Sequence, residues 1–185
     1  SYIAGYSAAI KLNTFAVTSF TTLANGMSNF TAQNMGAGKL DRVKKGFRGG
    51  MVMTLCITVA FSLVYFIFSD AAVMIFLNDS SVVAKQTGIN FLRIVSPFYS
   101  VVAMKILADG VLRGSGAMKQ FMIATFSDLI LRVILAYIFT YAMGSITGVW
   151  IAWPVGWVIA TVLSLWFYKS GSWSKHYIPE NETQF

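Results

Sequence analysis

The chain has 185 residues, of which 56% are hydrophobic and 11% are charged, and its formal net charge is +7. Soluble domains carry about 25% charged residues, so this composition argues against a soluble domain and predicts an all-α protein that spans a membrane. The basic residues lie beside apolar segments, which favours a lipid bilayer as partner over nucleic acid.

The first expected span covers residues 8–35 and is amphipathic. Its polar residues recur every three or four positions, so they share one helical face. This polar stripe can join neighbouring helices by hydrogen bonds or line a water-filled cavity, and its amides favour the cavity. A lipid-facing stripe is strongly disfavoured because unsatisfied polar groups in hydrocarbon are costly. The stripe consists of Thr14, Thr18, Thr22, Asn25, Asn29 and Gln33, and the opposite face carries Leu12, Phe15, Ala16, Phe20, Leu23 and Met27.

A basic, glycine-broken segment at 36–49 follows, and we expect it to be a loop. It holds five basic residues and one acid, Asp41. The positive-inside rule places such a loop on the cytoplasmic side. The next expected span, 50–68, is almost wholly apolar. Residues 69–80 lack a basic excess and include a short interfacial stretch, so we expect them on the outer side.

The third expected span covers 84–112 and contains a proline near its middle. Pro97 should kink this helix because it cannot donate a hydrogen bond to the carbonyl of Arg93. The segment 113–120 combines glycines with basic residues. It therefore predicts a second cytoplasmic turn.

Two further spans are expected at 121–143 and 149–168, with an uncharged outer turn at 144–148 between them. Aromatic residues gather at both ends of the last span, which is typical of the two membrane interfaces. The polar tail 171–185 is expected in the cytoplasm. The aromatic residues are Trp150, Trp153 and Trp157 at the outer end and Trp166, Tyr168 and Trp173 at the inner end.

The alternation of inner and outer segments predicts the orientation of the whole chain. Five spans place the N-terminus outside and the C-terminus in the cytoplasm. One more helix before Ser1 would bring both ends inside. We therefore expect a longer protein in which residues 1–170 form most of a six-helix lobe.

Two acids lie within the expected spans, and each has a base one helical turn away. Asp109 lies four residues after Lys105 and four before Arg113. Asp128 lies four residues before Arg132. Such acids can be structural ion pairs or members of a proton or cation relay. We favour the structural interpretation, because an adjacent base holds an acid ionised and both acids are expected within about two turns of the inner loops.

The chain shows no catalytic constellation and no phosphate-binding loop, so we expect no enzyme activity. One cysteine and one histidine cannot form a metal site, and no cofactor is expected. Tyr99 lies near the expected middle of the bilayer. Together with abundant Phe and Met, it suits the binding of flat organic cations.

Four segments resemble those of multidrug and toxic compound extrusion (MATE) transporters, and the resemblance covers about residues 3–170. Residues 33–43, QNMGAGKLDRV, resemble the loop after the second helix of each lobe. Residues 110–117, GVLRGSGA, resemble the loop after the fourth helix. Residues 127–132, SDLILR, and 153–157, WPVGW, are similar to segments in the last two helices.

The resemblance implies a fold, a function and a partner. MATE transporters have twelve helices in two lobes and export cationic drugs in exchange for protons or sodium ions. The chain would be the C-terminal lobe without its first helix, in a bacterial inner membrane, with the N-terminal lobe as the missing partner. In the sodium-coupled branch of the family, the fourth helix of this lobe has an acid soon after its proline. Here Phe98, Tyr99 and Ser100 follow Pro97, so no coupling residue is carried over.

We therefore expect part of a secondary active transporter that exports organic cations or drugs by antiport. One alternative is a flippase for lipids or lipid-linked oligosaccharides, whose cavity would need more bases than Lys11 and Lys105. Another is an inactive membrane fragment, because one lobe cannot enclose a two-lobe cavity. The candidate cavity residues are Thr18, Asn25, Asn29, Gln33 and Tyr99, and the candidate coupling residues are Asp109 and Asp128.

Overall fold

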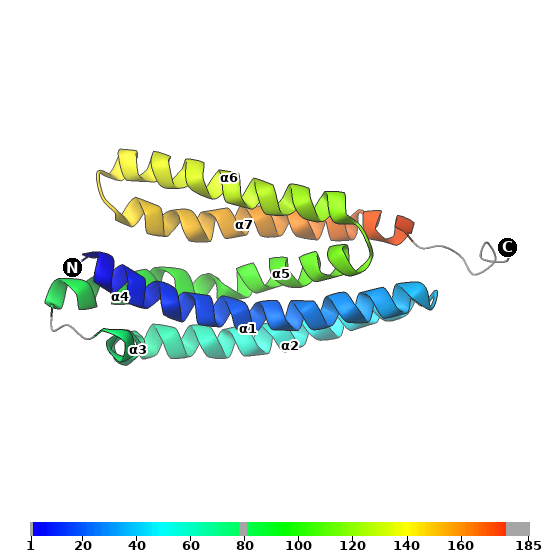
Figure 1. The fold of residues 1–185 in the computed structure, drawn as a ribbon, viewed down its shortest axis with the longest axis horizontal. Helices are drawn as coiled ribbons and strands as arrows, with labels where there is room; N and C mark the ends of the chain where they lie inside the picture. The colour runs from blue at the N-terminus through cyan, green and yellow to red at the C-terminus, as the bar shows by residue number, and fades with distance from the viewer. Residues whose placement is uncertain (1, 78–80, 177–185) are drawn as a thin grey trace.

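The computed structural model describes residues 2–77 and 81–176, and helices make up nearly all of this part of the chain (Figure 1). No strand occurs in it, so the prediction of an all-α fold is confirmed. The elements are α1 (Tyr2–Gly36), α2 (Leu40–Ile67), α3 (Ser69–Phe76), α4 (Val82–Val95), the 3-10 turn η1 (Ser96–Phe98), α5 (Tyr99–Gly114), α6 (Met118–Met143), α7 (Thr147–Lys169) and the 3-10 turn η2 (Ser172–His176).

The long helices lie side by side along the length of the molecule (Figure 1). α1 packs on α2, α4 and α5, while α6 packs mainly on α7. α5 also packs on α7 and so connects the two groups. The turns after α1 and α5 lie at the same end as the end of α7, and α3 and the turn after α6 lie at the opposite end (Figure 1).

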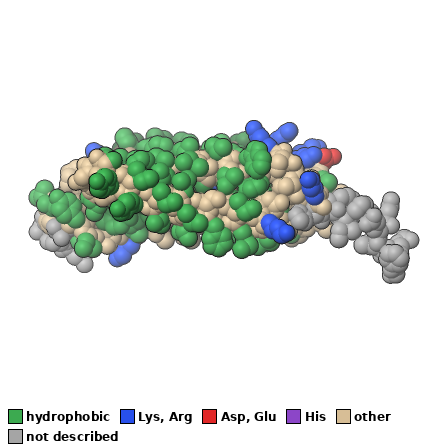
Figure 2. Space-filling model, turned by 90° about the horizontal axis from the view of Figure 1, so that it is seen from above, with side chains coloured by type: hydrophobic (Ala, Val, Ile, Leu, Met, Phe, Trp, Pro, Cys, Tyr) green, Lys and Arg blue, Asp and Glu red, His purple; other side chains and the backbone are tan. Residues whose placement is uncertain are grey.

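Lysine and arginine side chains gather at one end of the molecule (Figure 2). The turns after α1 and α5 and the end of α7 meet there, so three segments far apart in the sequence contribute to one basic surface. We call this the basic end. Its side chains include Lys39, Arg42, Lys44, Lys45, Arg48, Lys119 and Lys169.

Within residues 2–77 and 81–176, four helical segments are long and apolar enough to cross a membrane. They are Leu40–Ile67, Val82–Gly114, Met118–Met143 and Thr147–Lys169. α1 has 35 residues and is about 50 Å long, more than the hydrocarbon thickness of about 30 Å. The polar stripe lowers the mean hydropathy of α1. That α1 crosses the membrane, and that the chain has five spans, therefore stay predictions.

The loop predicted for residues 36–49 is wrong for most of its length. Only residues 37–39 separate α1 from α2, and the basic residues that follow lie on the first turns of a helix. Val43 and Phe47, one turn apart, are buried in an apolar cluster that includes Leu107. This buried pair stabilises the start of α2, and a count of bases alone does not reveal it.

The structure has an interruption at Pro97, where the sequence predicted a kink within one helix. α4 ends at Val95, and one 3-10 turn separates it from α5. The hydroxyl of Ser62 donates a 2.7 Å hydrogen bond to the carbonyl of Ser96, which connects the break to α2. The break thus has a partner on a neighbouring helix, as irregular backbone within a membrane requires.

The aromatic residues of the last span lie mainly inside the protein. Trp150 and Trp157 are buried in a core that α1, α4, α5 and α7 share. Trp173 is buried against Tyr168, although it belongs to the predicted polar tail. The assignment of these three tryptophans to interfacial belts is therefore wrong, because their rings fill space between helices. Trp166 remains 61% exposed.

α1 and α5 approach each other closely because small residues face each other. A methyl group at Gly110 would lie 2.6 Å from the carbonyl oxygen of Ala24, and one at Gly114 would overlap the carbonyl of Ser28. Small residues at helix interfaces allow this approach in membrane proteins. The contact positions the charged residues of α5 beside α1.

Candidate functional site

A cavity of about 270 Å³ lies among α1, α5, α6 and α7. Ionisable side chains reach it from two helices, Lys105 from α5 and the pair Asp128 and Arg132 from α6. α1 contributes amide and hydroxyl groups, and α7 contributes aromatic rings. We call this the charged cavity, and its other lining residues are Asn13, Thr14, Val17, Thr18, Val102, Ile106, Trp153 and Trp157.

Asp128 and Arg132 form the predicted ion pair in the wall of this cavity. The guanidinium of Arg132 donates to Oδ2 of Asp128 at 2.8 Å and lies 4.8 Å from the ring centroid of Trp153. Oδ1 of Asp128 and Nε of Arg132 are buried and have no hydrogen-bond partner among the residues that the structure describes. The pair therefore leaves a buried acceptor and a buried donor without a protein partner beside a polar cavity.

Asp109 has a different environment although its spacing to a base is the same. Nζ of Lys105 donates to its Oδ2 at 2.6 Å, and the hydroxyl of Ser164 on α7 donates to Oδ1 at 2.7 Å. The side chains of Lys105 and Asp109 are 8% and 6% exposed. Both carboxylate oxygens are satisfied, and the ion pair holds Lys105, which lines the charged cavity.

Two details of these pairs differ from the sequence predictions. Asp128 lies ten residues after Met118, where α6 begins, or about 15 Å along the helix axis. It is therefore nearer the middle of the bundle than expected. Arg113 donates to Oδ1 of Asn25 on α1 at 3.0 Å, whereas Lys105 is the ion-pair partner of Asp109.

The polar stripe of α1 lies on the exposed surface of the lobe. The side buried against other helices is the apolar one, with Leu12, Ala16 and Phe20. Phe15, expected on the buried side, is 63% exposed. Apart from the contact of Asn25 with Arg113, no stripe side chain bonds to another described helix. The exposed stripe residues are Thr14, Thr18, Thr22, Asn25, Asn29 and Gln33.

The structure brings only some of the predicted site residues together. Thr18 lines the charged cavity with Asp128, while Asn25, Asn29 and Gln33 continue along α1 towards the basic end. Tyr99 is fully buried in the aromatic core, where its ring contacts those of Phe20, Tyr65 and Trp157. Tyr99 thus lies apart from the exposed stripe.

Two residues of the site were missed from the sequence. Asn13 is buried, and its Oδ1 has no partner within the described residues. Asn13 was missed because it falls between the apolar positions Leu12 and Ala16 on the helix and outside the polar stripe that begins at Thr14. Ser164 was missed because hydroxyls are common in helices. Ser164 could have been noticed because Thr161 and Ser164 lie three positions apart, and so on one face, in a largely apolar helical segment.

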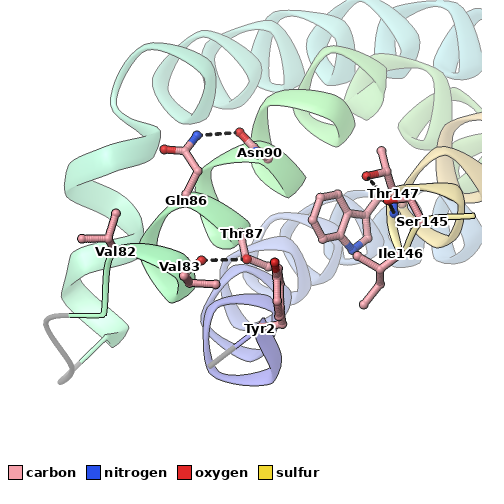
Figure 3. A pocket seen from close by; sticks show the side chains of 10 residues that line it. Tyr2, Val82, Val83, Gln86, Thr87, Asn90, Ser145, Ile146 and Thr147 are labelled. Carbon is pink, nitrogen blue, oxygen red and sulfur yellow. Dashed lines mark hydrogen bonds between the residues drawn. The ribbon is translucent and has the colours of Figure 1, made fainter.

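A larger hollow of about 630 Å³ opens at the end opposite the basic end (Figure 3). It lies between the start of α1, α4 and the turn after α6. Gln86 donates to Asn90 at 2.8 Å, and Thr87 donates to the carbonyl of Val83. The described side chains around it include no lysine, arginine, aspartate or glutamate. It can accept neutral polar groups, but it offers no carboxylate, whereas the charged cavity includes Asp128.

Comparisons with known proteins agree with this architecture. A profile of the MatE family matches residues 1–138. The chain is 23% identical over 181 residues to a probable multidrug resistance protein NorM of Thermotoga maritima, and the match covers 97% of this chain and 39% of that protein. A solved structure, an inward-facing multidrug resistance MATE family transporter of the MOP superfamily, has a TM-score of 0.83 at 19% identity.

That structural match covers 98% of this chain and 41% of the solved chain. The chain therefore spans about two fifths of the length of these relatives. The likeness to the solved structure shows the fold, and the family profile covers most of the chain. The resemblance seen in the sequence is confirmed, and the chain belongs to the MATE family of multi-pass membrane transport proteins.

Proposed function

We propose that this chain is part of a secondary active transporter that exports organic cations or drugs in exchange for protons or sodium ions. The observation that carries the proposal is the Asp128–Arg132 pair, which lines the charged cavity and has buried polar atoms without a hydrogen-bond partner among the described residues. A carboxylate inside a membrane protein is a natural group to bind and release a cation. The family membership and the multidrug relatives support export as the direction of transport.

The packing around Asp128 suggests how a cation would change the lobe. Arg132 lies over Trp153 of α7, and Gly156 of α7 lies against the pair, since a methyl group there would be 3.7 Å from Oδ1 of Asp128. A proton or sodium ion on Asp128 would weaken its bond to Arg132. The released guanidinium would alter the contact between α6 and α7, which in turn packs on α5. A cation can thereby shift the balance between two conformations.

We assign the exposed stripe of α1 to the substrate path. Its amides and hydroxyls lie uncovered by the other described helices, and a surface of this kind is costly against lipid. In the complete transporter it would face the N-terminal lobe across a central cavity, with this chain as the C-terminal lobe. Small organic cations would pass between the lobes along Thr18, Asn25, Asn29 and Gln33.

The proposed setting is a bacterial inner membrane with the basic end in the cytoplasm. The positive-inside rule supports this orientation, because the basic side chains gather at one end (Figure 2). α1 would then begin on the outer side and α7 would end in the cytoplasm. The bilayer is the partner of the apolar outer surface, to which α6 contributes many exposed side chains.

Transport in proteoliposomes of the complete transporter tests the coupling proposal. Asp128→Asn should reduce efflux driven by a proton or sodium gradient by about tenfold or more. Asp41→Asn is the matched control, since it removes an exposed acid at the basic end and should leave coupling unchanged. Full gradient-driven efflux by the Asp128→Asn protein would refute the role of Asp128.

The alternatives receive less support from the structure. A flippase would need several bases that face its cavity, and the sequence offered only Lys11 and Lys105. Of these, Lys11 lies over the ring of Phe76 at 5.9 Å and does not line the charged cavity. The chain alone is expected to be inactive, because it lacks a second wall for the stripe. Drug efflux by vesicles that contain this chain alone would contradict the two-lobe mechanism.

A further inference from the structure

A second charged hollow, of about 420 Å³, lies at the basic end between the start of α2 and the end of α7. Lys44 and Arg48 reach it from α2, and Lys169 reaches it from α7. No acid lines it, and none of the three bases forms an ion pair within residues 2–77 and 81–176. Three positive charges from distant parts of the chain thus surround one space.

Stacked aromatic rings form the wall that holds these bases together. The ring of Phe47 stacks on Tyr168 with centroids 3.9 Å apart, and Tyr168 stacks on Trp173 at 5.8 Å with the planes only 5° apart. Trp173 is buried, and its Nε1 donates to the carbonyl of Tyr168 at 3.0 Å. These contacts connect α2, α7 and η2, so the hollow has a defined shape.

We propose that this hollow binds the phosphate of an anionic phospholipid from the adjacent membrane leaflet. A guanidinium can donate two parallel hydrogen bonds to a phosphate, and lysines act as additional point charges. Three bases without an acid favour a headgroup with net negative charge over a zwitterionic one. Basic pockets between transmembrane helices are a recurrent type of lipid site.

The surface beside the hollow suits the rest of a lipid molecule. Val52 lies one helical turn beyond Arg48 and is 64% exposed. Trp166 lies one turn before Lys169 and is also exposed. Apolar surface therefore extends from the hollow along both helices in the direction of the bilayer core. This continuity favours a lipid, with acyl chains attached, over a free phosphate ion.

Native mass spectrometry of the full chain in detergent micelles tests the proposal. Dioleoylphosphatidylglycerol and dioleoylphosphatidylcholine are titrated separately, and the fraction of lipid-bound chain is measured. The double variant Arg48→Gln/Lys169→Gln should bind the phosphatidylglycerol roughly thirtyfold more weakly than the unmodified chain. The matched control Lys45→Gln/Lys119→Gln removes the same charge from the same end outside the hollow, and should change binding by less than about twofold.

Several results would overturn the lipid site. Equal binding of the two lipids, or equal losses in the two double variants, would show an unspecific basic surface. Displacement of phosphatidylglycerol by an equal concentration of inorganic phosphate would identify a free anion as the ligand. If the double variant loses helicity by circular dichroism, the exposed substitution Lys169→Gln alone should still weaken binding by about fivefold.

Discussion

The two acids inside the helices differ in how fully their oxygens are bonded. Asp109 accepts hydrogen bonds from Lys105 and Ser164, whereas Asp128 bonds only to Arg132 and keeps one buried oxygen without a described partner. A fully bonded buried pair is costly to break, whereas a buried oxygen without a hydrogen bond needs a partner that the described residues do not supply. The residues therefore divide into a structural pair and a candidate coupling pair.

Replacement of Asp109 should destabilise the bundle strongly. Asp109→Asn leaves the ammonium of Lys105 buried without a counter-charge, which costs about 3–5 kcal/mol. Thermal unfolding of the purified chain in detergent, followed by circular dichroism, should show a large fall in Tm. Ser164→Ala removes one hydrogen bond to the carboxylate of Asp109 and should cost less, about 1.5–3 kcal/mol.

A double variant separates charge burial from packing in this prediction. Lys105→Met/Asp109→Leu removes both charges, and it should recover most of the stability lost in Asp109→Asn. If the double variant unfolds at as low a temperature as Asp109→Asn, an uncompensated charge is not the cause of the loss.

Among the elements, α1 has the clearest division of faces. Its apolar face packs on α2, α4 and α5, and its polar stripe lies on the surface. Its close contact with α5 depends on Gly110 and Gly114. α1 can therefore belong to a rigid lobe and still present a polar wall to a second lobe.

Cysteine labelling of the complete transporter tests the orientation of α1. In a background where Cys56 is replaced by serine, Thr18→Cys and Asn29→Cys should react rapidly with a charged, water-soluble thiol reagent. Ala16→Cys and Ala24→Cys should react slowly, because both positions are fully buried. Similar rates at all four positions would exclude a water-filled path along the stripe.

The contact between α1 and α5 should not tolerate a larger side chain at Gly110. Gly110→Val would force a branched side chain against the carbonyl of Ala24, and overpacking of this kind costs about 1–3 kcal/mol. Gly49→Val is the control, because a methyl group at Gly49 meets open space. Thermal unfolding of the two variants should show a lower Tm for Gly110→Val only, and equal Tm values would show that the helices can separate at little cost.

In the whole molecule, charge is distributed unevenly between the two ends. The three segments that meet at the basic end come from the start of α2, the start of α6 and the end of α7 (Figure 1). The opposite end includes the uncharged turn between α6 and α7. This asymmetry is the physical basis of the proposed orientation.

Labelling of intact cells with a membrane-impermeant thiol reagent measures this orientation. In the background without Cys56, Ser145→Cys should react in intact cells, and Lys119→Cys should react only after the membrane is permeabilised. Both positions are exposed, so a difference in their labelling in intact cells should come only from the side of the membrane on which each lies. The reverse pattern would place the basic end outside and refute the proposed topology.

Much of this fold was predictable from the sequence because the relevant signals are local. Pro97 cannot donate a backbone hydrogen bond to its own helix, and residues four apart, such as Asp128 and Arg132, meet on any α-helix. Pro154, by contrast, lies inside the unbroken helix α7, so a proline by itself does not fix where a helix ends. Gly116 and Gly144 end their helices with φ of +82° and +58°, which glycine adopts without strain. The start of α2 and the location of Trp150 and Trp157 were not predictable, since both depend on which faces pack together.

The sequence by itself determined the helical membrane fold, the family resemblance, an irregularity at Pro97 and the two charge pairs. Only the tertiary structure decided which acid keeps an unbonded oxygen, because Ser164 reaches Asp109 from 55 positions away. It also decided that Lys44, Arg48 and Lys169 share one hollow. Helix propensity and spacing act within a few residues, whereas burial and hydrogen-bond satisfaction depend on helices that the chain brings together from far apart.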